Sequence, residues 1–469
     1  MPRETEPRSS PDIPTLGPVD HARVLARVLL SPVVKGPIVR RPRVVGLAER
    51  IDLDSAGVAE MQRLRSRYGA GPVQLRIPGR RIALLLAPED VHRVLNEGPE
   101  PFSPATLEKR GALNHFEPGS SLVSSAQQRL SRRPFNEQVL ETDRPVHSHA
   151  EQMTDIITEE VGALLGHADF TGTLDWDGFA VMWGRMVRRI VLGESARDDE
   201  QVTDDLRRLR ERGNLSYLMP QNHRLRKRFL DRLQEYVVRA EPGSLAAMVA
   251  QTPAPADAKP VQQMPQWLFA FDAEAWATFR ALALLVSHPG AAEAARLEMA
   301  GTVPASPGAE STPGSEGRAE AGPARPCGPR DQPLLRAAVL ESLRLWPTTP
   351  LILRDSTAGT RWRNGTLPAG AGLVIFAPFF HRDDQTVPEA HRFSPELWSG
   401  DRGDRDWPLV PFSGGPGMCP GRNVVLLTAS LVLGELLRQR EITAAETLDT
   451  SQLPGTLSPF HLRFDIRRG

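Results

Sequence analysis

The sequence is poor in cysteine, in net charge and in long apolar runs. Its two cysteines, Cys327 and Cys419, are too few for a disulfide-stapled secreted scaffold or for a cysteine-ligated iron–sulfur cluster. The 57 basic residues balance the 57 acidic ones, so the composition indicates no polyanionic partner such as nucleic acid. No apolar run reaches the roughly 18 residues of a membrane span, and the N-terminus lacks the apolar core of a signal peptide. We therefore expect a cytoplasmic protein with no membrane span.

Two stretches lack the apolar residues that a folded core requires. Residues 1–20 are rich in proline, serine and charged residues, and residues 301–331 are rich in proline, glycine, serine, alanine and glutamate. These compositions predict a disordered N-terminal tail and a disordered insert. Residues 21–469 then form one large domain that contains the insert, because the motifs of a single site are spread over most of this length.

Helical periodicity dominates the rest of the chain. The pattern predicts helices over residues 54–68, 127–139, 146–165, 176–192, 199–212, 223–239, 267–287, 333–345 and 422–437. Short strands are predicted over residues 73–77, 82–86, 351–354 and 372–376, and Pro78-Gly79 joins the first two as a hairpin. We therefore expect a mainly α fold with small β-sheets.

The stretch from Phe412 to Gly421 places Cys419 in a loop rich in glycine and proline. The loop leads into the predicted helix 422–437, whose unpaired N–H groups and dipole favour a thiolate, which is either a nucleophile or a metal ligand. The glycines allow the backbone to approach a flat partner closely. An isolated cysteine here would be interpreted more simply as a small buried hydrophobic residue.

The spacing Phe-x-x-Gly-x-x-x-Cys-x-Gly resembles the haem-binding loop of the cytochrome P-450 family. Glu341-x-x-Arg344, followed by Trp-Pro-Thr-Thr-Pro, is a second motif of that family. The resemblance covers roughly residues 50–469, with its strong motifs in the C-terminal third. It implies a single large triangular helical domain with a smaller β-rich part. It also implies haem b (iron protoporphyrin IX) as the cofactor and Cys419 as the iron ligand.

The resemblance further implies which residues contact the haem. In the loop these are Phe412, Ser413, Met418, Cys419 and Gly421. The family usually has arginine or histidine where this chain has Gly417, and His-x-x-x-Arg where this chain has Gln128 and Arg132. We therefore expect Arg132 and Arg354 to bind the haem propionates more strongly than usual, with Gln128 donating an uncharged hydrogen bond. Arg129 is interpreted as part of a solvated basic face.

The predicted central helix departs from the family at the oxygen-activating position. Ala270-Phe271-Asp272-Ala273-Glu274 replaces the usual Gly-x-Asp/Glu-Thr-Thr above the haem. By resemblance Ala270 contacts the cofactor and Asp272 brings protons in, whereas Ala273 lacks the threonine hydroxyl. Glu274, an ordered water or a polar group of the substrate would replace that hydroxyl. Alternatively, Glu274 pairs with a cation such as Arg280.

Two further groups of residues are assigned by the resemblance. Glu341 and Arg344 would form a buried network with Arg392 or His391 that holds the cysteine loop. The turn 454–460 would face the substrate together with Phe269, Phe271, Thr348, Thr349, Leu351 and Ile352. These residues indicate a largely apolar pocket.

The activity implied is insertion of one oxygen atom from O2 into a small, largely apolar substrate, such as a natural-product intermediate. No Gly-x-Gly-x-x-Gly follows a strand, so electrons would come from a separate ferredoxin or flavodoxin that docks near Arg129 and Arg133 on a monomeric enzyme. Two alternatives stay open. One is a scaffold of this fold that recruits a partner without oxidising anything, and the other is a peroxide-dependent haem enzyme.

Overall fold

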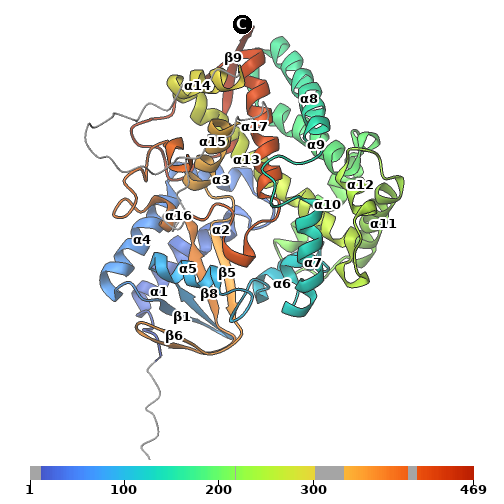
Figure 1. The fold of residues 1–469 in the computed structure, drawn as a ribbon. Coiled ribbons are helices and arrows are strands. Elements are labelled where there is room, and N and C mark those ends of the chain that lie inside the picture. The colour runs from blue at the N-terminus through green and yellow to red at the C-terminus, as the bar shows by residue number, and fades with distance from the viewer. Residues whose placement is uncertain (1–11, 217, 301–331, 400–408, 469) are drawn as a thin grey trace, which may run out of the picture.

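The computed structural model describes residues 12–216, 218–300, 332–399 and 409–468 (Figure 1). The predicted insert at 301–331 and the first 11 residues of the predicted tail lie outside this part of the chain. The prediction of a disordered tail is wrong for residues 12–20. The N–H groups of Ile13 and Leu16 donate to Thr366 O and Gln74 O, and both side chains are buried, so this segment has the apolar anchors that its proline content obscures.

Helices make up most of the described chain, which confirms the predicted mainly α fold. They are α1 (Pro18–Val24), α2 (Leu30–Lys35), α3 (Pro42–Arg50), α4 (Leu53–Tyr68), α5 (Pro88–Asn96), α6 (Leu107–Leu113), α7 (Ala126–Val139), α8 (Ala150–Thr171), α9 (Trp176–Leu192), α10 (Glu200–Gly213), α11 (His223–Arg239), α12 (Leu245–Gln251), α13 (Met264–Ser287), α14 (Pro289–Met299), α15 (Pro333–Leu345), α16 (Ala377–Arg382) and α17 (Arg422–Gln439). The predicted bounds of α9, α11 and α15 are those observed. The largest shift is at α8, which continues to Gly172, a residue in the left-handed conformation that ends helices.

A five-stranded sheet lies at one end of the molecule, in the order β1-β2-β8-β5-β3 (Figure 1). Its strands are β1 (Val73–Ile77), β2 (Arg80–Leu84), β3 (Phe102–Ser103), β5 (Leu351–Ser356) and β8 (Gly372–Phe376). β2 and β8 run parallel and the other pairs are antiparallel. Alternate residues of β5 are buried, and Arg354 lies on its buried face together with Ile352. Strand β5 thus places the buried Arg354 beside Ser413, in the loop that precedes α17.

Two smaller sheets complete the fold. β4 (Thr173–Asp175), β10 (Arg463–Arg468) and β9 (Arg440–Ala444) pair in the order β4-β10-β9, and β6 (Thr360–Trp362) pairs with β7 (Gly365–Leu367). The sequence pattern did not predict these strands, because they are short and their charged residues break the apolar alternation. The first of these sheets attaches the C-terminal strand to the start of α9.

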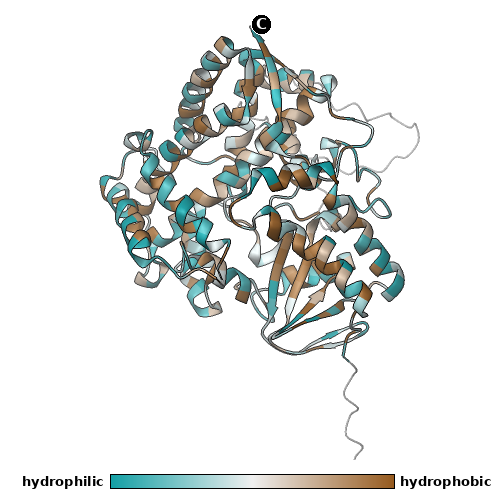
Figure 2. Cartoon of the chain, turned by 180° about the vertical axis from the view of Figure 1, so that it is seen from behind, coloured by the Kyte–Doolittle hydropathy of each residue, from teal (hydrophilic) through white to brown (hydrophobic). Residues whose placement is uncertain are grey.

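The main hydrophobic core surrounds α13, and a second core lies beneath the five-stranded sheet. Figure 2 shows apolar residues along the strands of this sheet and along the central helices. Fifteen of the 24 residues of α13 are buried, which explains its apolar sequence without a functional role.

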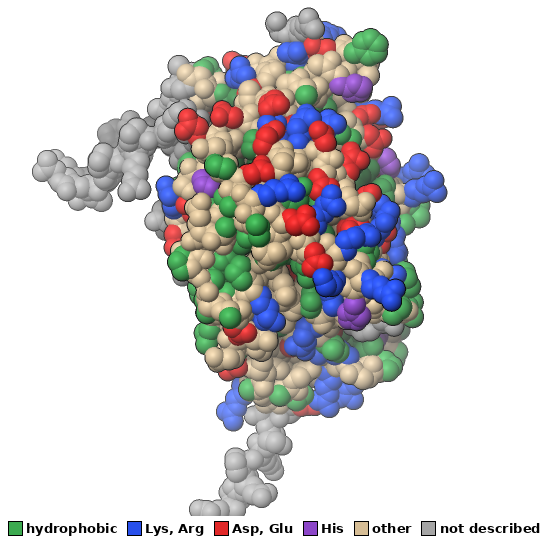
Figure 3. Space-filling view, turned by 90° about the vertical axis from the view of Figure 1, so that its right-hand side faces the viewer, with side chains coloured by type: hydrophobic (Ala, Val, Ile, Leu, Met, Phe, Trp, Pro, Cys, Tyr) green, Lys and Arg blue, Asp and Glu red, His purple; other side chains and the backbone are tan. Residues whose placement is uncertain are grey.

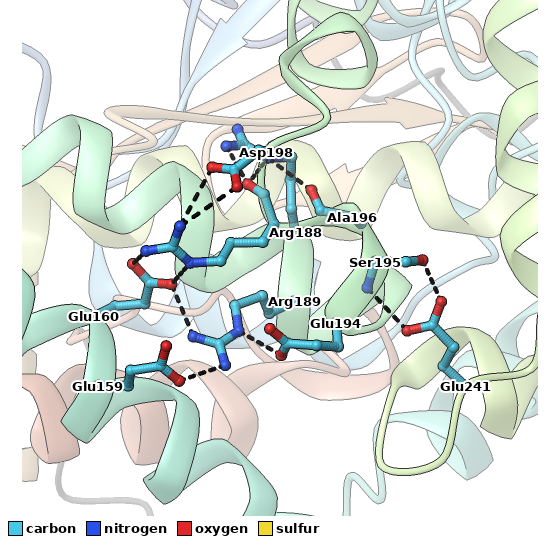
Figure 4. Close-up of polar contacts among 10 residues, drawn as sticks. Glu159, Glu160, Arg188, Arg189, Glu194, Ser195, Ala196, Asp198 and Glu241 are labelled. Atoms are coloured by element: carbon cyan, nitrogen blue, oxygen red, sulfur yellow. Dashed lines mark hydrogen bonds and ion pairs between the residues drawn. The ribbon is translucent and has the colours of Figure 1, made fainter.

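Ion pairs join helices on the periphery. Arg189 on α9 binds Glu159 and Glu160 on α8, with N–O distances of 2.7 and 2.8 Å (Figure 4). Arg188 beside it donates to the carbonyl oxygens of Ala196 and Arg197. Basic and acidic side chains intermix on the face in Figure 3. No helix of the described residues is long and apolar enough to cross a membrane.

Candidate functional site

The loop that carries Cys419 has a tightly folded backbone. The Cys419 N–H donates to Phe412 O at 3.0 Å, and Ser413 and Gly415 have φ values of 63° and 57°. A Cβ atom on Gly415 would lie 2.2 Å from Leu95 O, so only glycine fits where the loop meets the end of α5. The backbone hydrogen bond and this contact fix the position of the cysteine.

Residues of α7 and the turn after it hold the loop through its carbonyl oxygens. Arg129 donates to Pro416 O at 2.9 Å, Arg133 to Met418 O at 2.6 Å and Thr142 to Pro420 O at 2.8 Å. The interpretation of Arg129 as part of a solvated face is wrong, because its side chain is only 8% exposed. The Arg133 side chain is 13% exposed and also pairs with Glu137. Neither arginine is free to attract a docking partner.

A cluster of three cations lies beside this loop. Arg354 donates to Ser413 Oγ at 3.1 Å, and Lys109 on α6 donates to Leu353 O at 3.2 Å. Burial and, to a smaller extent, the positive charge of Arg129 together lower the pKa of Arg354 to about 10. Burial and the charge of Arg354 also hold the pKa of Lys109 well below its usual value.

Within the described residues, Lys109, Arg129 and Arg354 form no ion pair with a carboxylate. Asp355 and Glu108, whose charges act on Lys109, pair with Arg80. Glu137, whose charge acts on Arg129, pairs with Arg133. The cluster therefore carries excess positive charge.

Arg354 explains the glycine at position 417. A Cβ atom on Gly417 would lie 2.7 Å from Nη2 of Arg354. The guanidinium therefore occupies the space beside the loop, where the family usually has a basic side chain. The positive charge at this place comes from β5 rather than from the loop.

The Cys419 thiol lies in a low-dielectric environment. Burial raises its pKa, and the N–H of Gly421 and the charge of Arg133 offset only part of this shift. The sequence argument that the following helix favours a thiolate is thus outweighed by desolvation. A coordinated metal ion would displace the thiol proton, because metal ligation deprotonates a coordinating thiol.

Glu341 and Arg344 form the predicted network. The two side chains are fully buried and make two parallel bonds of 2.6 and 2.7 Å. Arg344 also donates to Arg392 O at 2.7 Å, whereas the Arg392 side chain is exposed, so this residue takes part through its backbone and not through its guanidinium. His391 instead accepts from Arg382 at 3.0 Å. The network holds the segment that precedes the cysteine loop.

Gln128 and Arg132 have protein partners of their own. Gln128 closes the capping box of α7 with Ser125. Arg132 is 1% exposed and donates to Ser124 Oγ and Asp257 O. Their contact with a cofactor stays a prediction.

The residues of α13 assigned to oxygen activation lie on two faces. Ala270 and Ala273 are partly accessible, and Asp272 pairs with the buried Arg210 of α10. Glu274 is 3% exposed, and its Oε1 is hydrogen-bonded to Thr428 Oγ1 on α17. Burial raises the pKa of Glu274 well above its usual value and so favours the neutral carboxyl group, while the hydrogen bond from Thr428 opposes this shift.

The alternative pairing of Glu274 with Arg280 is wrong. Arg280 donates to Leu457 O at 2.8 Å and Trp346 O at 3.3 Å, in a cavity at the far end of α13. Thr348 and residues 455–457, 459 and 460 line this cavity as well. Of the other predicted pocket residues, Phe271 and Ile352 are buried in the two cores, Leu351 and Phe269 pack against them, and Thr349 is exposed.

Comparison with known proteins identifies the family. A sequence model of the family described as Cytochrome P450 matches residues 270–456, a range that holds Glu341, Arg344, Arg354 and Cys419. Over these residues, about two fifths of the chain, the sequence matches the cytochrome P450 family. It is 33% identical over 132 residues to cytochrome P450 98A8 of Arabidopsis thaliana, covering 27% of each chain. It is 32% identical over 103 residues to cyclooctat-9-en-7-ol 5-monooxygenase of Streptomyces melanosporofaciens, covering 22% of each. The chain thus matches only about a quarter of the length of these curated relatives.

Solved cytochrome P450 structures share the fold over nearly the whole chain. The retinoic acid-bound cyanobacterial CYP120A1 superposes with a TM-score of 0.67 at 17% identity, covering 87% of this chain and 94% of that chain. CYP102L1 superposes with a TM-score of 0.68 at 16% identity, covering 99% and 100%.

The site residues fit the haem iron cofactor of the cytochrome P450 family. A haem presents two propionate carboxylates, and the cations Lys109, Arg129 and Arg354 are the charges that such groups require. Cys419 would supply a sulfur ligand from a loop that remains partly accessible. Sequence reasoning missed Lys109, because it stands between Glu108 and Arg110 and such a run of charges gives no local signal of burial.

Proposed function

We propose that this chain is a haem-thiolate monooxygenase that binds haem b. The observation that carries the proposal is the partly accessible Cys419 thiol, in a loop beside three cations that form no ion pair with a carboxylate among the described residues. Noncovalent haem b is favoured because neither cysteine stands in the Cys-x-x-Cys-His motif of covalent attachment. Bound through the Cys419 sulfur, haem iron would activate O2 with two electrons and two protons and place one oxygen atom in the substrate.

The protein residues then hold and orient the reactants. Arg129, Arg354 and Lys109 bind the propionates, while Arg129 and Arg133 also keep the cysteine loop in place. Phe412, Met418 and Gly421 lie in the same loop, and Phe412 O accepts from the Cys419 N–H. Ala270 provides a small surface on α13 against which a flat group can lie.

Proton delivery is assigned to Asp272 and to the substrate. Asp272 pairs with Arg210, and its side chain is 48% exposed, so it is within reach of solvent protons. Glu274 accepts a hydrogen bond from Thr428 on α17, about 100° around the helix from Ala273. Its carboxyl group is therefore held away from Ala273, and a polar group of the substrate or an ordered water would serve as the relay.

Electrons are assigned to a separate acidic carrier of the ferredoxin or flavodoxin type. Arg129 and Arg133 are occupied by the loop, so docking would use other cations. Arg422 is exposed three residues after Cys419, and its neighbour Asn423 donates to Thr142 O, close to the exposed Arg144. Arg144 pairs with Glu141 at 3.2 Å, so Arg422 is the arginine that chiefly presents positive charge beside the cysteine loop.

The test uses the CO-bound, dithionite-reduced protein loaded with haem. Wild type should show the red-shifted Soret band that a thiolate ligand produces, Cys419→Ala should lose it, and Cys327→Ala should keep it. A wild-type protein that binds no haem, or a Cys419→Ala variant with an unchanged band, would leave the scaffold alternative as the better account. Peroxide-driven turnover without an electron carrier would favour the peroxide-dependent alternative.

A further inference from the structure

A small cavity opens between the N-terminal helices and the far end of α13. Its volume is about 40 Å³. A water molecule requires about 10 to 15 Å³ of such space, so the cavity has room for roughly three heavy atoms, the size of a carboxylate group. Its apolar walls include the indole rings of Trp276 and Trp346 and the ring of Phe460. Trp276 and Arg280 follow Ala273 by three and seven residues, so they lie on the same face of α13.

The cavity lining carries more positive than negative charge. Three cations, Lys35, Arg40 and Arg280, line it together with a single carboxylate, Asp54. The Nζ atom of Lys35 lies 2.6 and 2.7 Å from the two oxygens of Asp54, and Thr456 and Ser31 donate to the same carboxylate. Asp54 is therefore paired with Lys35, and it acts on Arg40 and Arg280 only through electrostatic attraction without a hydrogen bond.

Arg40 and Arg280 have only carbonyl oxygens and a ring as partners among the described residues. Arg40 donates to Thr348 O at 2.8 Å and Gly36 O at 3.2 Å, and it lies 5.5 Å from the centre of the Trp276 ring. Arg280 donates to Leu457 O and Trp346 O. Their mutual repulsion and burial lower the pKa of Arg280 to about 9, which still leaves it charged at neutral pH.

The nearby carboxylates of Glu49 and Asp52 do not pair with Arg40 or Arg280. Glu49 interacts with Arg280 electrostatically, but its carboxylate accepts from the Ser458 N–H and lies 3.5 Å from His461. Asp52 accepts from the Thr456 N–H. Both are outside the lining of the cavity. Two guanidinium groups thus face a small space with no anion to pair with.

We propose that Arg40 and Arg280 bind the ionised acid group of the substrate, with its carbon skeleton against Trp276 and extending along α13 toward Ala273. This assignment rests on the proposed monooxygenase function and names its substrate class as organic acids. Arg280 lies seven residues from Ala273, about 10 Å along the helix, so the oxidised carbon would be remote from the acid group.

The test compares matched acids and alcohols by isothermal titration calorimetry on the haem-loaded protein. The probes are decanoate with decan-1-ol and 4-phenylbutyrate with 4-phenylbutan-1-ol. At least one acid should bind about ten-fold more tightly than its alcohol, and Arg40→Gln and Arg280→Gln should each remove this preference while leaving alcohol binding unchanged. Arg188→Gln is the control, because Arg188 is also buried and bonded to carbonyl oxygens. Trp176, at the start of α9, packs against the cavity residue Phe460, and Arg188 lies about 18 Å further along the same helix.

Three results would overturn the assignment. The first is equal affinity for acid and alcohol in both pairs. The second is an acid preference that both arginine variants retain, and the third is binding of acetate or inorganic phosphate as tight as that of the preferred acid, which would indicate a free-anion site. Because calorimetry needs no turnover, an acid preference in a protein that oxidises nothing would refute the proposed function while leaving the acid site intact.

Discussion

Replacing Arg354 with methionine should loosen haem binding without unfolding the protein. The guanidinium is 3% exposed and lies against Gly417 and Ser413, so no solvent cation can take its place. A hydrogen bond to a charged group contributes about 1.5 to 3 kcal/mol, which corresponds to a roughly 10- to 150-fold faster loss of haem. Arg129→Met should fall in the same range, because Arg129 belongs to the same cluster.

The rate of haem loss can be measured by transfer to excess apomyoglobin, followed by absorbance. Arg188→Met is the matched control, because it removes a buried arginine with similar backbone partners from α9. It should leave the transfer rate within about two-fold of wild type, since it is remote from the loop. If Arg354→Met and Arg129→Met also transferred haem at the wild-type rate, the cluster would not bind the propionates and the fit argument would fail.

Three further outcomes are expected. Glu341→Ala leaves Arg344 buried without its partner and should lower the free energy of unfolding, measured by urea titration, by about 3 to 5 kcal/mol. The surface control Glu211→Ala should change the free energy of unfolding by less than about 1 kcal/mol. Similar urea midpoints for the two variants would contradict the buried network. The raised pKa of Glu274 means that the folded state holds its proton more tightly than the unfolded state, so this group costs stability once the pH exceeds the unfolded pKa. Glu274→Gln should therefore match wild type at pH 4 and be the more stable protein at pH 8, and a constant difference across that range would show that the carboxyl is not held neutral. Ala273→Thr should raise the ratio of product to NAD(P)H consumed on a substrate analogue that lacks the polar group, and no gain over wild type would argue against a substrate-assisted relay.

Local sequence patterns were sufficient for the cysteine loop and for the nine predicted helices, whereas shorter helices such as α3, α6 and α12 were not predicted. The apolar periodicity of α9, α11 and α15 located their ends because proline, glycine or a capping residue stands at each boundary. The pairing of Glu341 with Arg344 was likewise predictable, because side chains three residues apart lie next to each other on a helix.

Residues that depend on tertiary contacts were not predictable. Arg129 and Arg132 occupy neighbouring turns of α7, and only the position of the loop decides that Arg129 faces Pro416 O while Arg132 faces Asp257 O. The role of Gly417 was hidden for the same reason, because Arg354 reaches it from a strand 63 positions earlier in the chain. The N-terminal segment before α1 looked disordered because strand-like pairing of Ile13 and Leu16 with distant residues leaves no local signal.

The hydrogen bonds that hold the cysteine loop against α7 and the turn after it affect which substitutions the loop can accept in evolution. Arg129, Arg133 and Thr142 all bind backbone oxygens, which every amino acid possesses. The residues at 416, 418 and 420 can therefore be exchanged to retune the surroundings of the sulfur without releasing the loop. Arg129, Arg133 and Thr142 have no such freedom, because their side chains supply the hydrogen-bond donors. We therefore expect sequence variation in the loop and little variation at these three positions.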